Sequence, residues 1–380
     1  MIYLDQAATS FPKPRGVITE QMRCMRLYCG NSGRGSHKLA LASAEKIFEC
    51  RGLIAALFGS THPENVCFTM NTTMALNIAI KGLLRKGDHV LISDMEHNAV
   101  YRPISKLAAE GIITYDVFPT YVMDPSRSTA RICSAIAHLI RPNTRMLICS
   151  HVPNICSAVM PIAEIGALCR RKGILFVVDA AQSAGHLPID IEKMHIDALC
   201  APGHKGLLGP QGTGFVLWGE NVEADTLIEG GSGYQSLDPD MPIDLPERFE
   251  AGTLSTPAIA GLCEGIREIN RLGIDKIHLH EKRLNQRLQM LLESLDDLRV
   301  YPRQYNGSVL LFHSKTRPAD QIGMELDRRG FCVRTGFHCS ALGHRTLQTP
   351  SDGAVRVSTG IYNKVADIDA LFGALKEIVT

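Results

Sequence analysis

The sequence predicts an α/β protein: a mostly parallel central sheet in a large domain, and a smaller α+β domain. Strand-like and helix-like segments alternate through residues 66–218, which favours a parallel sheet with helices on both faces. Residues 174–178 form a continuous apolar run, as is typical of a strand buried on both faces. After Gly219 the alternation stops and a stretch rich in Gly, Pro and Asp follows. This change of pattern predicts the second domain.

Composition is that of an ordinary globular protein. The chain has 380 residues, 45% hydrophobic and 21% charged, and this length suggests two domains. The formal net charge is +1, so no overall field attracts nucleic acid or an anionic membrane, and we expect neither as a partner. The first eight residues lack the features of a signal peptide, and no apolar run is long enough to span a bilayer.

The twelve cysteines indicate a reducing compartment. They are scattered from Cys24 to Cys339, and no two form a Cys-x-x-Cys pair. This pattern supports neither a zinc site nor a disulfide framework. We therefore expect reduced thiols, no metal site and a cytoplasmic location.

The elements of the large domain follow from periodicity and from helix-ending residues. An extended segment at 1–8 precedes helices at 17–28 and 39–58, the second ended by Gly59. Strands are expected at 66–70, 89–93, 113–118, 145–150, 174–178, 196–200 and 214–218, with helices at 72–84, 99–110, 128–140 and 162–171.

The remaining residues predict the smaller domain. We expect a long loop at 229–246, a helical region at 258–295, strands at 307–312, 332–335 and 354–358, and a final helix at 364–379. The large domain is expected to span residues 15–255. The small domain is expected to combine residues 1–14 with residues 256–380.

A lysine surrounded by glycines is the first candidate for chemistry. Lys205 lies in the stretch 200–214 with five glycines, and His204 precedes it. Glycines at this density mark backbone that turns sharply or approaches a ligand closely. A lysine held there is a candidate amine nucleophile if its pKa is lowered. The alternative is a surface loop with a solvated lysine.

Polar residues also follow four of the predicted strands directly, where ligands bind in an open parallel sheet. Each alone has an ordinary interpretation as a helix cap or a loop side chain. Together with the lysine they favour pyridoxal 5'-phosphate (PLP), which needs a lysine, an acid for the ring nitrogen, and a helix start for the phosphate. These residues are Asn71, Thr72, Thr73, Asp94, Glu96, His97, His151, Asn154 and Asp179.

Eight short motifs, spread over nearly the whole chain, strengthen this interpretation. They are Tyr3-Leu-Asp-Gln-Ala-Ala8, Asn71-Thr-Thr73, Met95-Glu-His-Asn98, Val178-Asp-Ala-Ala-Gln-Ser183, Gly203-His-Lys205, Arg248-Phe-Glu-Ala-Gly-Thr253, Arg334-Thr-Gly-Phe-His-Cys339 and Arg356-Val-Ser. With them the chain resembles the class V aminotransferase family, and within it the cysteine desulfurase and selenocysteine lyase branch. The resemblance implies the PLP-dependent transferase fold of type I.

The resemblance also implies which residues hold the cofactor ring. Lys205 would bind the cofactor covalently and later move the α-proton of the substrate. His97 would stack on the ring and take part in proton transfer. Asp179 would pair with the ring nitrogen, Gln182 would bond the ring hydroxyl, and Asn154 would lie near both ring and substrate.

The phosphate and the substrate have further implied partners. Thr72, Thr73 and His204 would bind the phosphate, joined by Gly252 and Thr253 from the partner subunit of a homodimer. Pro202 departs from the family pattern, because proline has no N–H to donate where relatives have a hydroxyl residue.

Three residues would serve the substrate. Ala8 would line its pocket, and Arg356 would grip its carboxylate with a planar guanidinium, assisted by Arg334.

Cys339 is the one cysteine with an expected catalytic role. It lies between two predicted strands in a stretch with Gly343, Pro350 and Gly353, a composition that predicts a mobile loop. The resemblance implies that its thiolate attacks the sulfur of L-cysteine, keeps it as a persulfide, and releases L-alanine. An acceptor, such as a sulfur-acceptor protein, then takes the sulfur for iron–sulfur cluster assembly or another thio-cofactor.

Two alternatives to the desulfurase remain open at this stage. One keeps the cofactor and changes the reaction, to a selenocysteine lyase or a C–S lyase. The other is a non-catalytic scaffold with the same fold. The intact set Lys205, Asp179, His97 and Arg356 argues against the scaffold.

Overall fold

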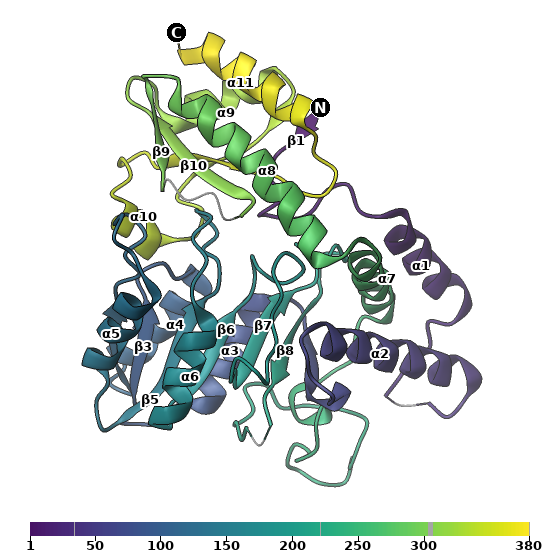
Figure 1. The fold of residues 1–380 in the computed structure, drawn as a ribbon. Helices are drawn as coiled ribbons and strands as arrows, with labels where there is room; N and C mark the ends of the chain where they lie inside the picture. Colours follow the sequence, from purple (N-terminus) through teal and green to yellow (C-terminus); the bar gives the residue numbers. More distant parts are fainter. Residues whose placement is uncertain (34, 221, 303–306, 380) are drawn as a thin grey trace.

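The computed structural model describes residues 1–33, 35–220, 222–302 and 307–379. A seven-stranded sheet, a four-stranded sheet and a two-stranded sheet organise the chain, with helices packed around them (Figure 1). In these residue ranges no helix is both long enough and apolar enough to cross a membrane.

The seven-stranded central sheet has the strand order β2-β8-β7-β6-β5-β3-β4. Strand β8 runs in the direction opposite to the other six strands, which are parallel to one another, so the prediction of a mostly parallel sheet is confirmed. The strands are β2 (Val66–Thr69), β3 (His89–Ser93), β4 (Thr114–Phe118), β5 (Thr144–Ser150), β6 (Leu175–Asp179), β7 (Ala198–Pro202) and β8 (Gly214–Trp218).

Helices bury both faces of this sheet. Along β6, Phe176 and Val178 join one apolar core and Val177 the other, as the alternation of side chains in a strand requires. Helices α2 (Lys38–Leu57), α5 (Thr129–Leu139), α6 (Ile162–Lys172) and α7 (Thr256–Leu272) cover the first face, and α3 (Thr72–Leu83) and α4 (Asn98–Ala109) cover the second. Helix α1 (Arg15–Leu27) packs on α7.

The C-terminal part has its own sheet and its own apolar core. The four-stranded sheet has the order β12-β13-β10-β9, and it packs against three helices. The elements are α8 (Ile274–Glu293), β9 (Leu298–Tyr301), β10 (Val309–Ser314), α9 (Ala319–Arg328), β12 (Arg334–Gly336), α10 (Ala341–Leu347), β13 (Ala354–Ser358) and α11 (Val365–Val379). Short 3₁₀ turns at Pro63–Asn65 and Glu247–Phe249 complete the described elements.

The N-terminal segment joins this C-terminal part. Strand β1 (Ile2–Tyr3) pairs in parallel with β11 (Phe331–Cys332), and Asp5 bridges to Ser358. Figure 1 shows β1 beside the first turns of α11, at the end of this helix opposite the C-terminus. The domain limits at 15 and 255 stay a prediction.

Three sequence expectations differ from the structure. The helical region expected at 258–295 is two helices, because Gly273 between them has a φ of 86°. Strand β9 and helix α9 were not predicted. The stretch expected to be only a loop after Cys339 contains α10.

Candidate active site

A cavity of about 100 Å³ lies at the carboxyl ends of five strands of the central sheet. These strands are β2, β3, β5, β6 and β7, and the residues directly after them form the cavity wall. Nine residues that the sequence singled out line it together: Asn71, Thr72, Thr73, His97, Asn154, Asp179, Gln182, His204 and Lys205. The expectation of a single site at this edge therefore holds geometrically.

Lys205 lies in the loop that leaves the end of β7. The loop folds back on itself, since the Gly203 amide donates to the Thr213 carbonyl at 2.8 Å and the Gly209 amide donates to the Gly203 carbonyl at 2.8 Å. A Cβ on Gly206 would come within 2.3 Å of the Ala184 carbonyl oxygen. The glycines thus permit close packing that holds the lysine against the cavity, so the alternative of a solvated surface lysine is wrong.

The amine of Lys205 is shifted toward its neutral form. Burial lowers its pKa to about 8, and the charges of Arg356 and Arg334 act in the same direction. Asp179 opposes them. A useful fraction of the amine is therefore unprotonated and nucleophilic near neutral pH.

His97 lies at the N-terminus of α4 and caps it with its ring. Nδ1 accepts a hydrogen bond from the Ala99 amide at 3.0 Å, so the neutral ring carries its proton on Nε2. Burial lowers the pKa of His97 to about 4, and Lys205 contributes. The ring is therefore neutral at pH 7, and its position in the cavity wall excludes an ordinary loop histidine.

Asp179 is the last residue of β6 and only 2% of it is exposed. Its Oδ1 accepts from the Ala181 amide at 2.9 Å. Burial raises its pKa, while that hydrogen bond and the charge of Lys205 lower it. A carboxylate buried in this way requires a positive partner, and the protonated pyridine nitrogen of a cofactor in the cavity would supply one.

Glu96 is a residue to which sequence reasoning gave no role, although it follows a strand directly. It is fully buried, and its Oε1 accepts from the Ser93 hydroxyl and from the Ser150 amide. Burial raises the pKa of Glu96 to about 8, and the charge of Asp179 adds to this. Glu96 is therefore mostly protonated at pH 7.

The N-terminus of α3 offers unused hydrogen-bonding groups to the cavity. Asn71 caps this helix, because its Oδ1 accepts from the Met74 amide at 2.9 Å, so the interpretation of Thr72 or Thr73 as the cap is wrong. Among the described residues, Thr72 Oγ1 and His204 Nδ1 are buried without a hydrogen-bond partner. A helix start with unpaired polar atoms beside it fits a phosphate group.

Gln182 and Asn154 line the part of the cavity wall that is expected to face the cofactor ring and the substrate. Gln182 Nε2 donates to the Ala7 carbonyl at 2.9 Å, which ties this side chain to the segment that carries Ala8. Asn154 Nδ2 donates to the His338 carbonyl at 2.7 Å, while its Oδ1 is buried with no partner in the described chain. Together with the unpaired polar atoms at the start of α3, the amine of Lys205 and the carboxyl group of Asp179, these residues fit PLP.

Arg356 is buried and already engaged, with 1% of it exposed. One Nη atom lies 2.6 Å from Asp5 Oδ1, the other donates to the Asn154 carbonyl at 3.1 Å, and Nε has no partner in the described residues. A substrate carboxylate would therefore share Arg356 with Asp5. Arg334 lies closer to the thiol, with Nη2 at 3.9 Å from Cys339 Sγ.

Gly252 and Thr253 lie outside this cavity. They line a different hollow of about 430 Å³ together with Phe48 and Arg51 of helix α2. Within one chain they therefore do not approach Lys205. Their expected role toward the partner's phosphate stays a prediction.

Cys339 is exposed, in a tight turn after β12. His338 and Cys339 have φ values of 52° and 56°, a region that residues other than glycine rarely adopt. The Cys339 carbonyl accepts from the Asn98 amide at 2.8 Å, and the His338 carbonyl accepts from Asn154. These bonds attach the turn to the rim of the Lys205 cavity on two sides. The predicted mobility of the stretch stays a prediction.

Two stacked histidines support this turn from behind. His338 Nε2 donates to the Arg334 carbonyl at 3.2 Å, so its Nδ1 accepts from His344 Nε2 at 3.1 Å. His344 Nδ1 then accepts from the Thr349 hydroxyl at 2.8 Å. Burial lowers the pKa of His338 to about 3 and that of His344 to about 4, so both rings are neutral at pH 7.

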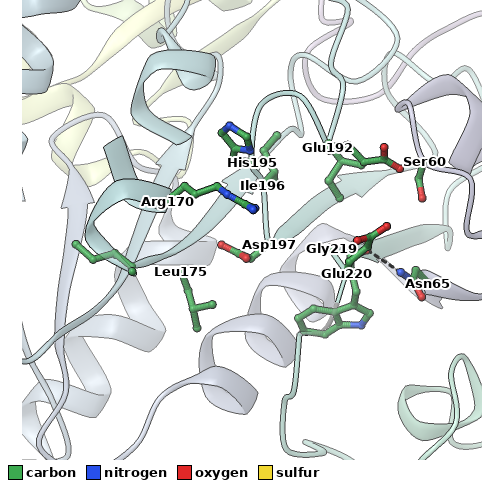
Figure 2. A pocket seen from close by; sticks show the side chains of 14 residues that line it. Ser60, Asn65, Arg170, Leu175, Glu192, His195, Ile196, Asp197, Gly219 and Glu220 are labelled. Carbon is green, nitrogen blue, oxygen red and sulfur yellow. Dashed lines mark hydrogen bonds between the residues drawn. The ribbon is translucent and has the colours of Figure 1, made fainter. Parts of the chain in front are cut away.

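A larger hollow of about 410 Å³ lies at the opposite edge of the central sheet (Figure 2). It is lined by Leu175 at the start of β6, by Asp197 just before β7 and by Trp218 at the end of β8. Asn65 Nδ2 donates to the Trp218 carbonyl at 3.3 Å on its wall. None of the predicted site residues lines it, so the chemistry belongs to the Lys205 cavity.

Comparisons with known proteins show the family of this chain. Residues 2–371 match the family described as aminotransferase class-V. A probable cysteine desulfurase of Methanothermobacter thermautotrophicus is 34% identical, over 99% of this chain and 94% of its own. A cysteine desulfurase of Yersinia pseudotuberculosis is 30% identical, over 100% of this chain and 93% of its own.

Solved structures give the same result. The apo cysteine desulfurase of Thermococcus onnurineus superimposes with a TM-score of 0.90 at 28% identity, over 100% of this chain and 94% of that chain. An Escherichia coli cysteine desulfurase shares the fold, with a TM-score of 0.87 at 23% identity, over 100% of this chain and 95% of that one. The chain therefore belongs to the class V aminotransferase family, in the branch that contains the cysteine desulfurases.

Proposed function

We propose that the chain is a PLP-dependent cysteine desulfurase that converts L-cysteine to L-alanine and holds the sulfur as a persulfide on Cys339. The observation that carries this is the turn at Cys339. Its backbone bonds to Asn98 and to Asn154, and both neighbour the Lys205 cavity. A transaminase needs no such thiol.

Each residue of the cavity has a separate role in this proposed reaction. PLP, when bound, supplies an electron sink for the negative charge that develops on the substrate. Asp179 would pair with the ring nitrogen, and the neutral ring of His97 would stack on the cofactor. Lys205 would hold the cofactor, and its amine, with a pKa of about 8, would take and return the α-proton. Arg356 and Arg334 attract the substrate carboxylate.

Sulfur leaves the substrate through Cys339. The thiolate of Cys339 attacks the substrate sulfur, an S–S bond forms, and the C–S bond breaks. The electron pair of the C–S bond stays on carbon, which takes a proton to become the methyl group of alanine. The guanidinium of Arg334 lies beside this thiol, with Nη2 3.9 Å from Sγ.

The test is alanine release from L-cysteine by the native chain and by Cys339→Ala, in the presence of a reductant. We expect the variant to retain PLP absorbance and to lose alanine release. Cys29→Ala is the matched control, because Cys29 is also an exposed cysteine but is not part of the site. Full activity in Cys339→Ala would refute the persulfide role.

The Cys339→Ala variant also distinguishes a cysteine desulfurase from a selenocysteine lyase. Selenium is the better leaving group, so an enzyme built for selenocysteine would keep turnover of that substrate without the thiol. We expect Cys339→Ala to lose activity toward cysteine more than toward selenocysteine. Native activity toward selenocysteine alone would favour the lyase.

We further propose a cytoplasmic homodimer that supplies sulfur for iron–sulfur clusters or another thio-cofactor through an acceptor. Exposed apolar side chains on α1 and α2 support dimerisation, since Met22, Met25 and Phe48 are 45%, 60% and 61% exposed. In the dimer, Gly252 and Thr253 would reach the phosphate site of the partner. Light scattering after gel filtration measures the assembly state, and a monomer at micromolar concentration would contradict the dimer.

A further inference from the structure

Cys339 lines a hollow that is distinct from the Lys205 cavity. This hollow, named here the thiol hollow, has a volume of about 530 Å³. Its wall includes Asn98, Arg102, Phe337, Cys339, Ser340 and Arg345. Pockets of this size suit small molecules up to roughly that of a short peptide.

The charged side chains that line the thiol hollow are all positive. Among the described residues that line it are two arginines and no carboxylate. Arg102 and Arg345 are exposed, and neither makes an ion pair within the described chain. Arg334 adds a third positive charge next to Sγ. Unpaired like charges around a concave surface raise the local concentration of anions.

The wall also offers an unused donor. The Ser340 side chain is fully buried, and its hydroxyl has no hydrogen-bond partner among the described residues. It lies next to the thiol in sequence and lines the same hollow. A buried hydroxyl without a partner is costly and is satisfied by a bound acceptor such as a carboxylate or sulfonate oxygen. Phe337, 50% exposed, supplies an apolar wall beside it.

We propose that the thiol hollow binds a low-molecular-weight anionic thiol, and that this thiol takes the sulfur from Cys339. The proposal rests on the proposed desulfurase function. The acceptor thiolate attacks the outer sulfur of the Cys339 persulfide and forms a new S–S bond to it. The bond between the two persulfide sulfurs breaks, its electron pair stays on Cys339 Sγ as a thiolate, and the acceptor leaves as a persulfide. No oxidant is consumed.

The first experiment probes the charge of the hollow without any turnover. The holoenzyme is alkylated with iodoacetate, which is anionic, or with iodoacetamide, which is neutral, and the labelling rate of the Cys339 peptide is followed by mass spectrometry. We expect the ratio of the two rates to exceed that of free cysteine. The double variant Arg102→Gln/Arg345→Gln should lower this ratio about threefold or more.

Two controls accompany the alkylation. Cys29, the other exposed cysteine, gives an internal reference in the same digest. Lys38→Gln removes a surface charge that does not line the hollow and should leave the ratio unchanged. A ratio equal to that of free cysteine, or one insensitive to the arginine variants, would overturn the proposal.

The second experiment measures transfer to small thiols of different charge during turnover of L-cysteine. The probes are 2-mercaptoethanesulfonate, 2-mercaptoethanol and cysteamine, and persulfide products are trapped and quantified beside alanine. We expect saturable transfer to the sulfonate, with weaker transfer to the other two. The arginine double variant should raise the apparent KM for the sulfonate and leave the first turnover of alanine unchanged.

The outcomes separate the two proposals. Alanine release without preference for the anionic thiol, or transfer only to a protein cysteine, would overturn the thiol hollow and leave the desulfurase standing. Absence of alanine from L-cysteine would overturn the desulfurase, whereas the alkylation ratio would still report on the charge of the hollow.

Discussion

At the scale of the residue, burial decides which side chains of the site are charged. Burial and the charges of two arginines lower the pKa of Lys205, while the charge of Asp179 raises it. Glu96, one position before His97, is kept protonated by burial and by the charge of Asp179. The site thus keeps a neutral His97 ring, a partly neutral Lys205 amine and a protonated Glu96 near Asp179. This distribution is what a cofactor with a positive ring nitrogen and a reactive carbonyl needs.

The pKa of Lys205 predicts how fast the cofactor-free protein takes up PLP. Only the unprotonated amine attacks the cofactor carbonyl, so uptake should accelerate as pH rises and level off above about 8. Stopped-flow absorbance of the lysine-bound cofactor measures this rate, and Lys205→Ala gives the blank. A rate that keeps rising to pH 10 would mean that the amine has its ordinary pKa.

At the scale of the element, the loop after β7 is held by close backbone contacts. A Cβ at Gly206 would come within 2.3 Å of the Ala184 carbonyl oxygen and 2.5 Å of the His186 ring. His186 is itself fixed, with Nδ1 2.8 Å from Glu281 on helix α8. Glycine is therefore required here by lack of space, and the loop cannot shift without moving Lys205.

This packing predicts the effect of Gly206→Ala. The added methyl group must push the Lys205 loop away from Ala184, so we expect lower PLP occupancy and lower alanine release in a folded protein. Gly52→Ala is the matched control, because no atom lies within 4 Å of a Cβ at Gly52 in helix α2. It should raise helix stability by about 0.5–1 kcal/mol and leave activity intact. Unchanged PLP occupancy in Gly206→Ala would contradict the packing argument.

At the scale of the whole molecule, several histidines are buried in the neutral form. Burial lowers the pKa of His151 and His338 to about 3, and that of His344 to about 4. His97 and His204 are lowered to about 4. In the unfolded chain each would titrate near its ordinary pKa of about 6.5.

These histidines predict acid sensitivity. Between about pH 6.5 and 4 these histidines become protonated in the unfolded chain but stay neutral in the native protein. Their contribution to the free energy of unfolding therefore falls as pH falls. Each histidine contributes up to about 1.4 kcal/mol per pH unit in that window. Glu96, with its pKa raised to about 8, acts with the opposite sign and reduces this slope, as do other buried carboxyl groups whose pKa is raised, among them Asp94 and Glu250. Urea titrations at pH 7.5, 6 and 5 measure the slope, and a stability that rises from pH 6 to 5 would contradict it.

The sequence determined the alternating strands and helices, because burial on one or two faces imposes a period that single residues reveal. It also determined the candidate site, because residues that follow parallel strands converge on one edge of the sheet. Lys205, His97 and Asp179 were found in this way. The family resemblance added Cys339, whose chemistry no periodicity could show.

Only the tertiary structure decided the contacts between distant segments. The pairing of Arg356 with Asp5 joins residues at opposite ends of the chain, and no local pattern predicts it. The break at Gly273 and the helix α10 depend on how short segments pack, which outweighs their weak local preferences. The protonated state of Glu96 and the positive hollow at Cys339 likewise arise from burial and from charges brought together in space, and these exist only once the chain has folded.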